Sequence, residues 1–228
     1  MKKNYFFIPI FLQAFIYLFT FCLFKIFAGF EVRGLANLTQ LKTRNAIFAL
    51  NHASEWDGIL LRVALPFFSM RWSPMHYVAM TRDYYNDSGW RKILYGGLLF
   101  RLLAAYPKYP GHKNYEVSLQ NHLSILRRGG NLCIFPEGIR TKDGTLGEAH
   151  GGVAFLTRET NIPVVPVAVE GLVRLTARSL LLGERKVIIT LGTPLAPQAI
   201  VPSEHPTVSD YKAGAQMVLN HVARLLNK

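Results

Sequence analysis

The sequence predicts an α/β fold in which a mixed, largely parallel sheet is flanked by helices, preceded by a membrane-associated hydrophobic helix. Short apolar, β-branched runs alternate with longer helical patterns from residue 30 onward. No Gly/Ser linker, repeat or charge block divides that region, and an uncharged apolar run comes before it. Alternating strands and helices are typical of a sheet covered by helices. We therefore expect a membrane anchor segment over residues 1–29 and one domain over residues 30–228.

The N-terminal apolar run extends from Tyr5 to Phe24 without a charged residue. Twenty helical residues rise about 30 Å, which matches the thickness of a hydrocarbon core. Pro9 is compatible with a bend or with a helix start. A cleaved signal peptide also begins with basic residues before an apolar run, but this run is long and no clear cleavage site follows it. We expect an uncleaved anchor, and the sequence leaves open whether it spans the bilayer or lies in one leaflet.

Basic residues at the two ends of this run predict the orientation of the protein. Two lysines precede the run, whereas four basic residues follow it closely: Lys25, Arg33, Lys42 and Arg44. The positive-inside rule then places the main domain in the cytoplasm. We expect the protein to work at the cytoplasmic face of the cell membrane.

Hydrophobic periodicity and turn residues predict the elements of the main domain. The expected strands are Asn45–Leu50, His76–Met80, Asn131–Phe135, Pro163–Val169 and Lys186–Leu191. The expected helices are Gly58–Leu65, Gly89–Ala104, Asn114–Arg128, Gly151–Thr160 and Ser209–Leu226. A capping signature, Thr207 followed by Asp210, precedes the last helix.

The composition points to an anionic partner. The chain has 26 lysines and arginines against 14 acidic residues, which gives a formal net charge of +12. Nucleic acid, an acidic membrane surface and a phosphorylated substrate all fit this charge. The basic residues are scattered rather than arranged in a stripe, and a membrane anchor is an unsuitable companion for a nucleic-acid binder, so we expect no nucleic acid. Two cysteines are too few for a disulfide framework or a structural metal site.

The first candidate site segment runs from Asn51 to Gly58, directly after a predicted strand. His52 and Asp57 are five residues apart across a strand-to-helix turn, so the carboxylate can hold one imidazole nitrogen and leave the other as a base. Such a base needs no serine or cysteine nucleophile if the substrate brings its own hydroxyl. Glu55 is the alternative partner of His52, and a local turn hydrogen bond is the purely structural interpretation.

The second segment, Phe135–Thr141, follows another predicted strand. Pro136 and Gly138 form a tight turn that exposes backbone amides, and Glu137 and Arg140 project from the same loop. The planar guanidinium group of Arg140 suits a phosphate. A solvated turn with an ion pair is the alternative.

Two further segments carry weaker signals. Val164–Val169 is an apolar strand in which Pro166 marks an edge or a bulge. Tyr106–Lys113 is a basic loop, where Lys108 is a candidate for anion binding and a solvated loop is equally compatible.

Taken in this order, the segments resemble the glycerolipid acyltransferase family, typified by 1-acyl-glycerol-3-phosphate (lysophosphatidic acid) acyltransferases. The family pattern is H-x-x-x-x-D, a basic loop, F-P-E-G-T-R and a V-P-V-type strand. Here it is carried by His52–Asp57, the Lys108 loop, Phe135–Arg140 and Val165–Val169. The resemblance covers about residues 25 to 195, and it identifies residues 30–228 as an acyltransferase domain.

The resemblance implies a reaction of phospholipid biosynthesis that gives phosphatidic acid. His52 would be the general base that removes a proton from the free hydroxyl of a lysophospholipid as it attacks an acyl thioester, and Asp57 would orient the imidazole. Glu137, Gly138 and Arg140 would hold the acceptor, with Arg140 and Lys108 near its phosphate. The donor would be acyl-CoA or acyl carrier protein. No acyl-enzyme, no cofactor and no metal is implied, and membrane lipids would be the surrounding partners.

Three positions depart from the family pattern. Ile139 replaces the usual threonine, Lys108 stands where an arginine is usual, and His150 occupies the region of a lysine. A lysine meets a phosphate as a point charge rather than as a fork, so a different lyso-lipid acceptor is the alternative within enzymes. A non-catalytic membrane-binding homologue is the alternative from another class, although it has no physical need of His52, Asp57, Glu137 and Arg140 together.

Overall fold

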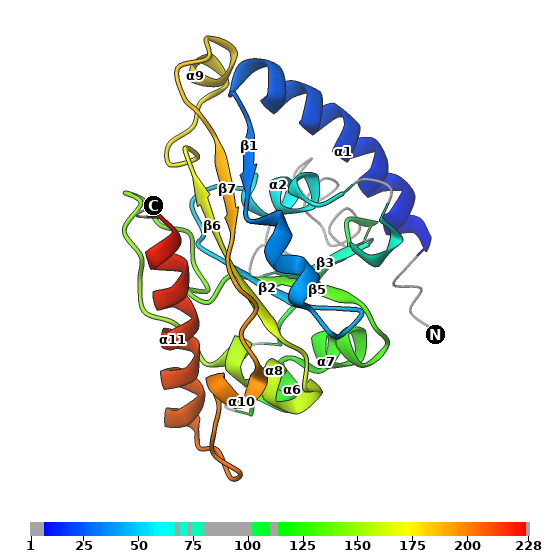
Figure 1. Cartoon of the computed structure of the whole chain (residues 1–228), viewed down its shortest axis with the longest axis vertical. Coiled ribbons are helices and arrows are strands. Elements are labelled where there is room, and N and C mark those ends of the chain that lie inside the picture. Colours follow the sequence, from blue (N-terminus) through cyan, green and yellow to red (C-terminus); the bar gives the residue numbers. More distant parts are fainter. Residues whose placement is uncertain (1–6, 67–68, 73, 80–101, 110–113, 227–228) are drawn as a thin grey trace, which may run out of the picture.

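The computed structural model describes the chain except residues 1–6, 67–68, 73, 80–101, 110–113 and 227–228. The described residues form a seven-stranded sheet with the order β1-β7-β6-β2-β5-β3-β4. All neighbouring strands run parallel except β6 and β7, which pair antiparallel. The predicted mixed, largely parallel sheet flanked by helices is therefore confirmed (Figure 1).

The strands are β1 (Glu31–Arg33), β2 (Ile47–Leu50), β3 (Met75–Ala79), β4 (Ala105–Pro107), β5 (Asn131–Ile134), β6 (Val164–Glu170) and β7 (Ile188–Leu191). The α-helices are α1 (Phe7–Phe27), α2 (Asp57–Ala64), α6 (Tyr115–Ser118), α7 (Gln120–Arg127), α8 (Gly152–Thr160), α9 (Ala177–Leu181), α10 (Pro197–Ile200) and α11 (Val208–Leu226). Two 3-10 helices cover Leu35–Gln40 and Met70–Trp72.

All five predicted strands are confirmed, each with ends within two residues of the prediction. The sequence analysis missed the short edge strands β1 and β4, and β4 occupies the start of the segment that was expected to be a basic loop. The prediction of a single helix over Asn114–Arg128 is wrong in one respect. The structure has two helices there, α6 and α7, which are separated at Leu119, where the backbone leaves helical geometry. Most of the helix expected over Gly89–Ala104 lies outside the described residues.

Two hydrophobic layers enclose the sheet because successive strand residues point to opposite faces. On β2, Phe48 and Leu50 join the core shared with α1, α2 and α9. Ile47 and Ala49 join the core shared with α7, α8, α10 and α11. In Figure 1, α1 and α2 cover one side of the sheet and α11 stands on the other.

Within the described residues, helix α1 covers Phe7–Phe27 and includes Pro9 near its described beginning. Among the described residues, α1 is the one helix that is long and apolar enough to cross a membrane. It packs against α2. At the other end of the chain, Thr207 and Asp210 exchange hydrogen bonds at the start of α11, which confirms the predicted cap.

Pro166 does not mark an edge, because β6 lies in the interior of the sheet between β2 and β7. The Pro166 carbonyl accepts a hydrogen bond from the Gly192 amide, so it faces the segment that follows β7. The nitrogen of Pro166 faces the same segment, just past Val167 and Leu191, which are the last pair of the β6–β7 ladder. Val164 pairs with Leu195, and Val167 pairs with Leu191. An interval of three residues on β6 therefore lies opposite an interval of four residues on the other segment. This extra residue is the bulge that was the other expectation for Pro166.

Candidate functional site

His52 and Asp57 meet in the loop between β2 and α2. His52 Nδ1 lies 2.9 Å from Asp57 Oδ2, and the same oxygen accepts hydrogen bonds from the backbone amides of Ala53 (2.7 Å) and Ser54 (2.8 Å). The Asp57 side chain is fully buried at the first turn of α2, whereas the His52 side chain is 23% exposed. With its Nδ1 proton donated to Asp57, the imidazole presents Nε2 as a proton acceptor. The structure thus pairs His52 with Asp57 and not with Glu55.

Two further residues fix the His52 ring and its loop, and the sequence analysis gave them no role. The Phe135 ring stacks on the imidazole with centroids 3.9 Å apart and planes 15° apart. The Asn51 side chain donates to the Val169 carbonyl (3.0 Å) and accepts from the Val169 amide (2.8 Å), which ties the end of β2 to β6. An asparagine immediately after a buried strand was the available signal for this tie.

Glu137 is buried and holds two loops together. One carboxylate oxygen accepts from the His52 amide (3.1 Å) and the other from the Gly147 amide (2.8 Å). Both oxygens are therefore occupied by main-chain donors. Glu137 is not among the described residues that line the cavities beside His52.

The other predicted residues lie around the mouth of the site. Arg140 is half exposed, and its Nη1 lies 3.3 Å from Glu55 Oε1. Gly138 has a positive φ of 71°, and a Cβ there would meet the His150 ring at 2.9 Å, so glycine is required twice over. Lys108 follows β4, the strand next to β3, and lines a cavity together with Gly138 and His150.

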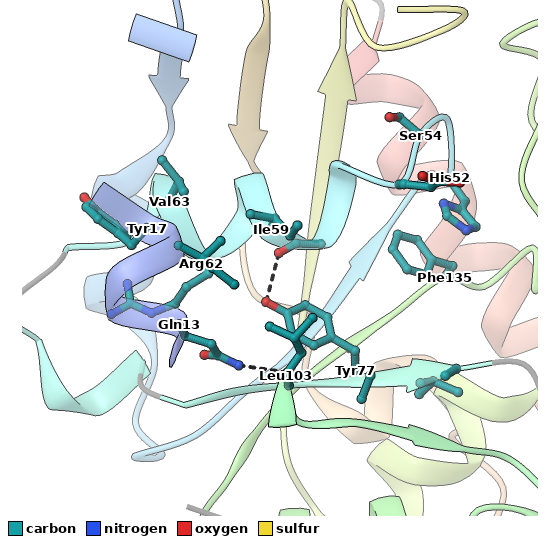
Figure 2. A pocket seen from close by; sticks show the side chains of 16 residues that line it. Gln13, Tyr17, His52, Ser54, Ile59, Arg62, Val63, Tyr77, Leu103 and Phe135 are labelled. Carbon is teal, nitrogen blue, oxygen red and sulfur yellow. Dashed lines mark hydrogen bonds between the residues drawn. The ribbon is translucent and has the colours of Figure 1, made fainter. Parts of the chain in front are cut away.

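A cavity of about 270 Å³ extends from His52 to α1, and we call it the α1 cavity. Figure 2 shows Gln13 and Tyr17 of α1 at one end and His52 and Phe135 at the other. Its lining is mostly apolar, with Arg62 as a buried cation. The signal for Gln13 was present in the sequence, because it is an amide within an apolar run.

A second cavity of about 190 Å³, the α8 cavity, also has His52 in its lining. Its lining includes Lys108, Tyr115, Gly138, His150 and Gly152. Gly152 is the first residue of α8, and no side chain of the described residues caps this helix. The uncapped N–H groups and the positive end of the helix dipole favour an anion there.

The two cavities share His52, Val78, Ala79 and Phe135. A base therefore sits where the two cavities meet, at the carboxyl ends of β2, β3 and β5, with Arg62 on the wall of the α1 cavity and Lys108 on the wall of the α8 cavity. Ligands bind at this edge in open α/β sheets. In the part of the chain that the structure describes, no three His, Cys, Asp or Glu side chains group as metal ligands.

Comparisons with known proteins find similar sequences and a similar fold. The chain is 36% identical over 53 residues to a chloroplastic 1-acyl-sn-glycerol-3-phosphate acyltransferase of Brassica napus, and the match covers 23% of this chain and 15% of that protein. It is 35% identical over 59 residues to a probable 1-acyl-sn-glycerol-3-phosphate acyltransferase of Mycoplasma pneumoniae, which covers 26% of this chain and 22% of that protein.

A solved structure shares the fold. The crystal structure of the 1-acyl-sn-glycerophosphate acyltransferase PlsC from Thermotoga maritima superposes with a TM-score of 0.60 at 20% identity, over 95% of this chain and 79% of that one. A family model described as Acyltransferase matches residues 29–170, which is more than half of the chain and contains His52, Asp57, Glu137 and Arg140. The chain therefore belongs to the acyltransferase family.

Proposed function

We propose that this protein transfers a fatty acyl group from acyl-CoA or acyl carrier protein to the free hydroxyl of 1-acyl-glycerol-3-phosphate, giving phosphatidic acid. The observation that carries the proposal is the His52–Asp57 pair at the junction of the α1 and α8 cavities. An acyl chain needs a mostly apolar space next to the base, and a phosphorylated glycerol needs a nearby cation, which Lys108 supplies in the α8 cavity.

In the proposed reaction, His52 Nε2 takes the proton of the acceptor hydroxyl while its oxygen attacks the thioester carbonyl. The new C–O bond forms, the C–S bond breaks, and the proton passes from the imidazolium to the departing thiolate. Asp57 stabilises the imidazolium through its 2.9 Å contact with Nδ1. The substrate hydroxyl is itself the nucleophile, so the mechanism uses no acyl-enzyme, no cofactor and no metal.

The acceptor phosphate is proposed to bind in the α8 cavity, between Lys108 and the first N–H groups of α8. Arg140 stands at the mouth of the site. Its contact with Glu55 is an exposed ion pair, which is worth about 0–1 kcal/mol and can be exchanged for a phosphate at little cost. Gly138 lets the loop pass close to His150.

Glu137 is proposed to position the site rather than to touch the acceptor. Its carboxylate is buried and is already shared between the His52 and Gly147 amides. Through the first of these bonds it fixes the backbone that carries the base. This role replaces the direct acceptor contact that the resemblance implied.

The names of the relatives support the choice of lysophosphatidic acid as acceptor, although the matches span only 15% and 22% of those two proteins. A second acceptor class is favoured by two residues, Lys108 and His150, which replace an arginine and a lysine of the family pattern. A lyso-lipid with a different headgroup is therefore the alternative. We also propose that the protein acts at the cytoplasmic face of the cell membrane, with α1 as its membrane contact and bilayer lipids around it.

The test is thioester consumption by the detergent-solubilised protein with acyl-CoA and lysophosphatidic acid, beside His52→Ala. Turnover that disappears in the variant supports both the reaction and the base. Turnover in both proteins would overturn the mechanism, and a protein whose biological activity survives His52→Ala would be a non-catalytic homologue. Activity on another lyso-lipid with none on lysophosphatidic acid, with either acyl-CoA or acyl carrier protein as donor, would overturn the choice of acceptor.

A further inference from the structure

Four exposed cations and an exposed isoleucine lie on two loops beside the mouth of the site. Arg140 and Lys142 belong to the loop that follows β5, and Ile139 in the same loop is 62% exposed. Arg174 and Arg185 stand on either side of α9, in the connection between β6 and β7. We call these five residues the basic rim. Among them, the proposed reaction gives a role to Arg140 alone.

Hydrogen bonds to main-chain carbonyls join the basic rim to the base. The Thr141 amide donates to the His52 carbonyl (2.8 Å), so the loop after β5 directly contacts the residue that carries the imidazole. Arg174 Nε donates to the Lys142 carbonyl (3.2 Å), which connects the two loops. Arg185 Nη1 donates to the carbonyl of the residue before Arg174 (3.0 Å). The four cations are therefore held on one surface that begins at the base.

The two loops also pack directly on each other. Gly144 has a φ of 94°, and a Cβ there would meet Val173 Cγ2 at 3.2 Å. An L side chain rarely adopts this φ, so glycine is favoured at this position. It lets the loop after β5 lie against the connection between β6 and β7, and this contact fixes the spacing of the cations.

The charges of the basic rim are not neutralised within the described residues. Lys142, Arg174 and Arg185 take part in none of the ion pairs there. Asp143 lies beside Lys142, but hydrogen bonds from Thr145 and from a second threonine of the same turn lower its pKa to about 2. Asp143 is thus ionised and bonded within its own turn, and the three cations face water.

The excess of positive charge comes from the connection between β6 and β7. Residues 171–187 carry four lysines and arginines and one acidic residue. One of these cations, Lys186, is paired with Glu31. The exposed residues of the loop after β5 include as many cations as carboxylates. The surface beside the site therefore has a net positive charge, and it attracts an acidic partner more strongly at low salt than at high salt.

The layout of the basic rim favours an acidic protein surface over a small anion. Lys142, Arg174 and Arg185 line neither the α1 cavity nor the α8 cavity, so they do not converge on one enclosed group. They are spread over two exposed loops, with the apolar side chain of Ile139 in the same surface. An apolar contact with charged residues around it is typical of an interface between two proteins.

We propose that the basic rim is the docking surface for acyl carrier protein, the acidic protein that presents the acyl thioester to His52. A carrier protein holds its thioester at the end of a flexible arm. Its protein surface can therefore stay on the exposed loops while the thioester carbonyl reaches the base. The identity of the partner rests on the proposed function, whereas the position of the surface rests on the exposed cations and on Ile139.

The first experiment measures binding without any chemistry. Fluorescently labelled holo acyl carrier protein, which has no acyl chain, is titrated with the detergent-solubilised full-length protein. Lys142→Gln/Arg174→Gln/Arg185→Gln should bind about tenfold more weakly at low salt. This difference should disappear in about 1 M salt, where the Debye length is about 3 Å. Lys142→Arg/Arg174→Lys/Arg185→Lys keeps the charges and should bind like wild type.

A matched control removes the same charge elsewhere on the surface. Arg44→Gln/Arg127→Gln/Lys212→Gln changes three exposed cations, and it should bind like wild type. Arg44 and Arg127 precede β2 and β5, so they lie at the opposite edge of the sheet from His52. Ile139→Ser should weaken binding several-fold at both salt concentrations, because the contact that it removes is apolar. Wild-type binding by the triple rim variant at low salt would overturn the proposal.

The second experiment compares the two donors in steady-state thioester consumption. With acylated carrier protein, the triple rim variant should raise the donor KM about tenfold and leave kcat and the acceptor KM unchanged. With acyl-CoA, its donor KM should change by less than about twofold. An equal rise with both donors would assign the cations to the phosphates of CoA and would overturn the carrier-protein surface.

The outcomes separate this proposal from the proposed function. A wild-type protein that binds the carrier protein through the rim and consumes no thioester would refute the reaction and leave the docking surface standing. Turnover with wild-type donor KM values in the triple rim variant would do the reverse. If the variant instead lost binding to phosphatidylglycerol vesicles and kept its affinity for the carrier protein, the rim would be a membrane contact and the proposal would be wrong.

Discussion

Replacing Asp57 with asparagine tests the electrostatic part of the site. Asp57 Oδ2 lies 2.9 Å from His52 Nδ1, and a charge pair at that distance interacts by about 6 kcal/mol at an effective dielectric constant of 20. Asparagine keeps an acceptor, and water screens the exposed quarter of the His52 side chain. We therefore expect about half of this energy to be lost from the transition state, which is about 3 kcal/mol or roughly a hundredfold in kcat.

The Michaelis constants should change much less, because Asp57 is not among the described residues that line either cavity. The assay is steady-state thioester consumption at saturating donor and acceptor, with circular dichroism as a check on folding. Asp210→Asn is the matched control, since it removes a carboxylate that caps α11 through Thr207 and lines neither cavity. A folded Asp57→Asn protein with more than half of the wild-type kcat would refute the proposed role of the carboxylate.

Three further predictions concern positioning and stability. Phe135→Leu removes the ring stacked on His52, and kcat should fall up to about tenfold while Phe135→Tyr restores most of it; equal rates in all three proteins would contradict this. Glu137→Gln leaves the His52 or Gly147 amide without its acceptor, which costs about 1–3 kcal/mol. Its thermal unfolding midpoint should fall by about 2–12 °C, with the acceptor KM nearly unchanged. Burial lowers the pKa of His122 to about 4 from its ordinary 6.5, so the unfolded state binds more protons between these values. Stability should therefore fall by up to about 3 kcal/mol as the pH drops from 6.5 to 4, and His122→Gln should flatten this slope in urea titrations; an unchanged slope would contradict the assignment.

Much of the fold was predictable because local patterns agree with the final packing. The five central strands are short apolar runs bounded by turn residues, and their short length and β-branched residues favour a buried strand over a helix. The strands β1 and β4 were missed because each has only three residues, and their pairing depends on neighbours far along the chain, Ile188 to Thr190 for β1 and Tyr77 to Ala79 for β4. The break between α6 and α7 is likewise decided by packing, since Leu119 is buried beneath α8.

The sequence by itself predicted that His52 meets a carboxylate, because a five-residue separation across a strand-to-helix turn allows His52 and Asp57 to touch, and the structure selected Asp57 over Glu55. It also determined that an apolar helix precedes the domain. Only the tertiary structure decided that both carboxylate oxygens of Glu137 accept hydrogen bonds from backbone amides, that Phe135 stacks on His52, and that one face of α1 is buried. Most of these contacts join distant parts of the chain: Glu137 and His52 are 85 positions apart, and Gln13 and Met75 are 62 positions apart. Their distances follow from how the layers pack, and no local pattern encodes that packing.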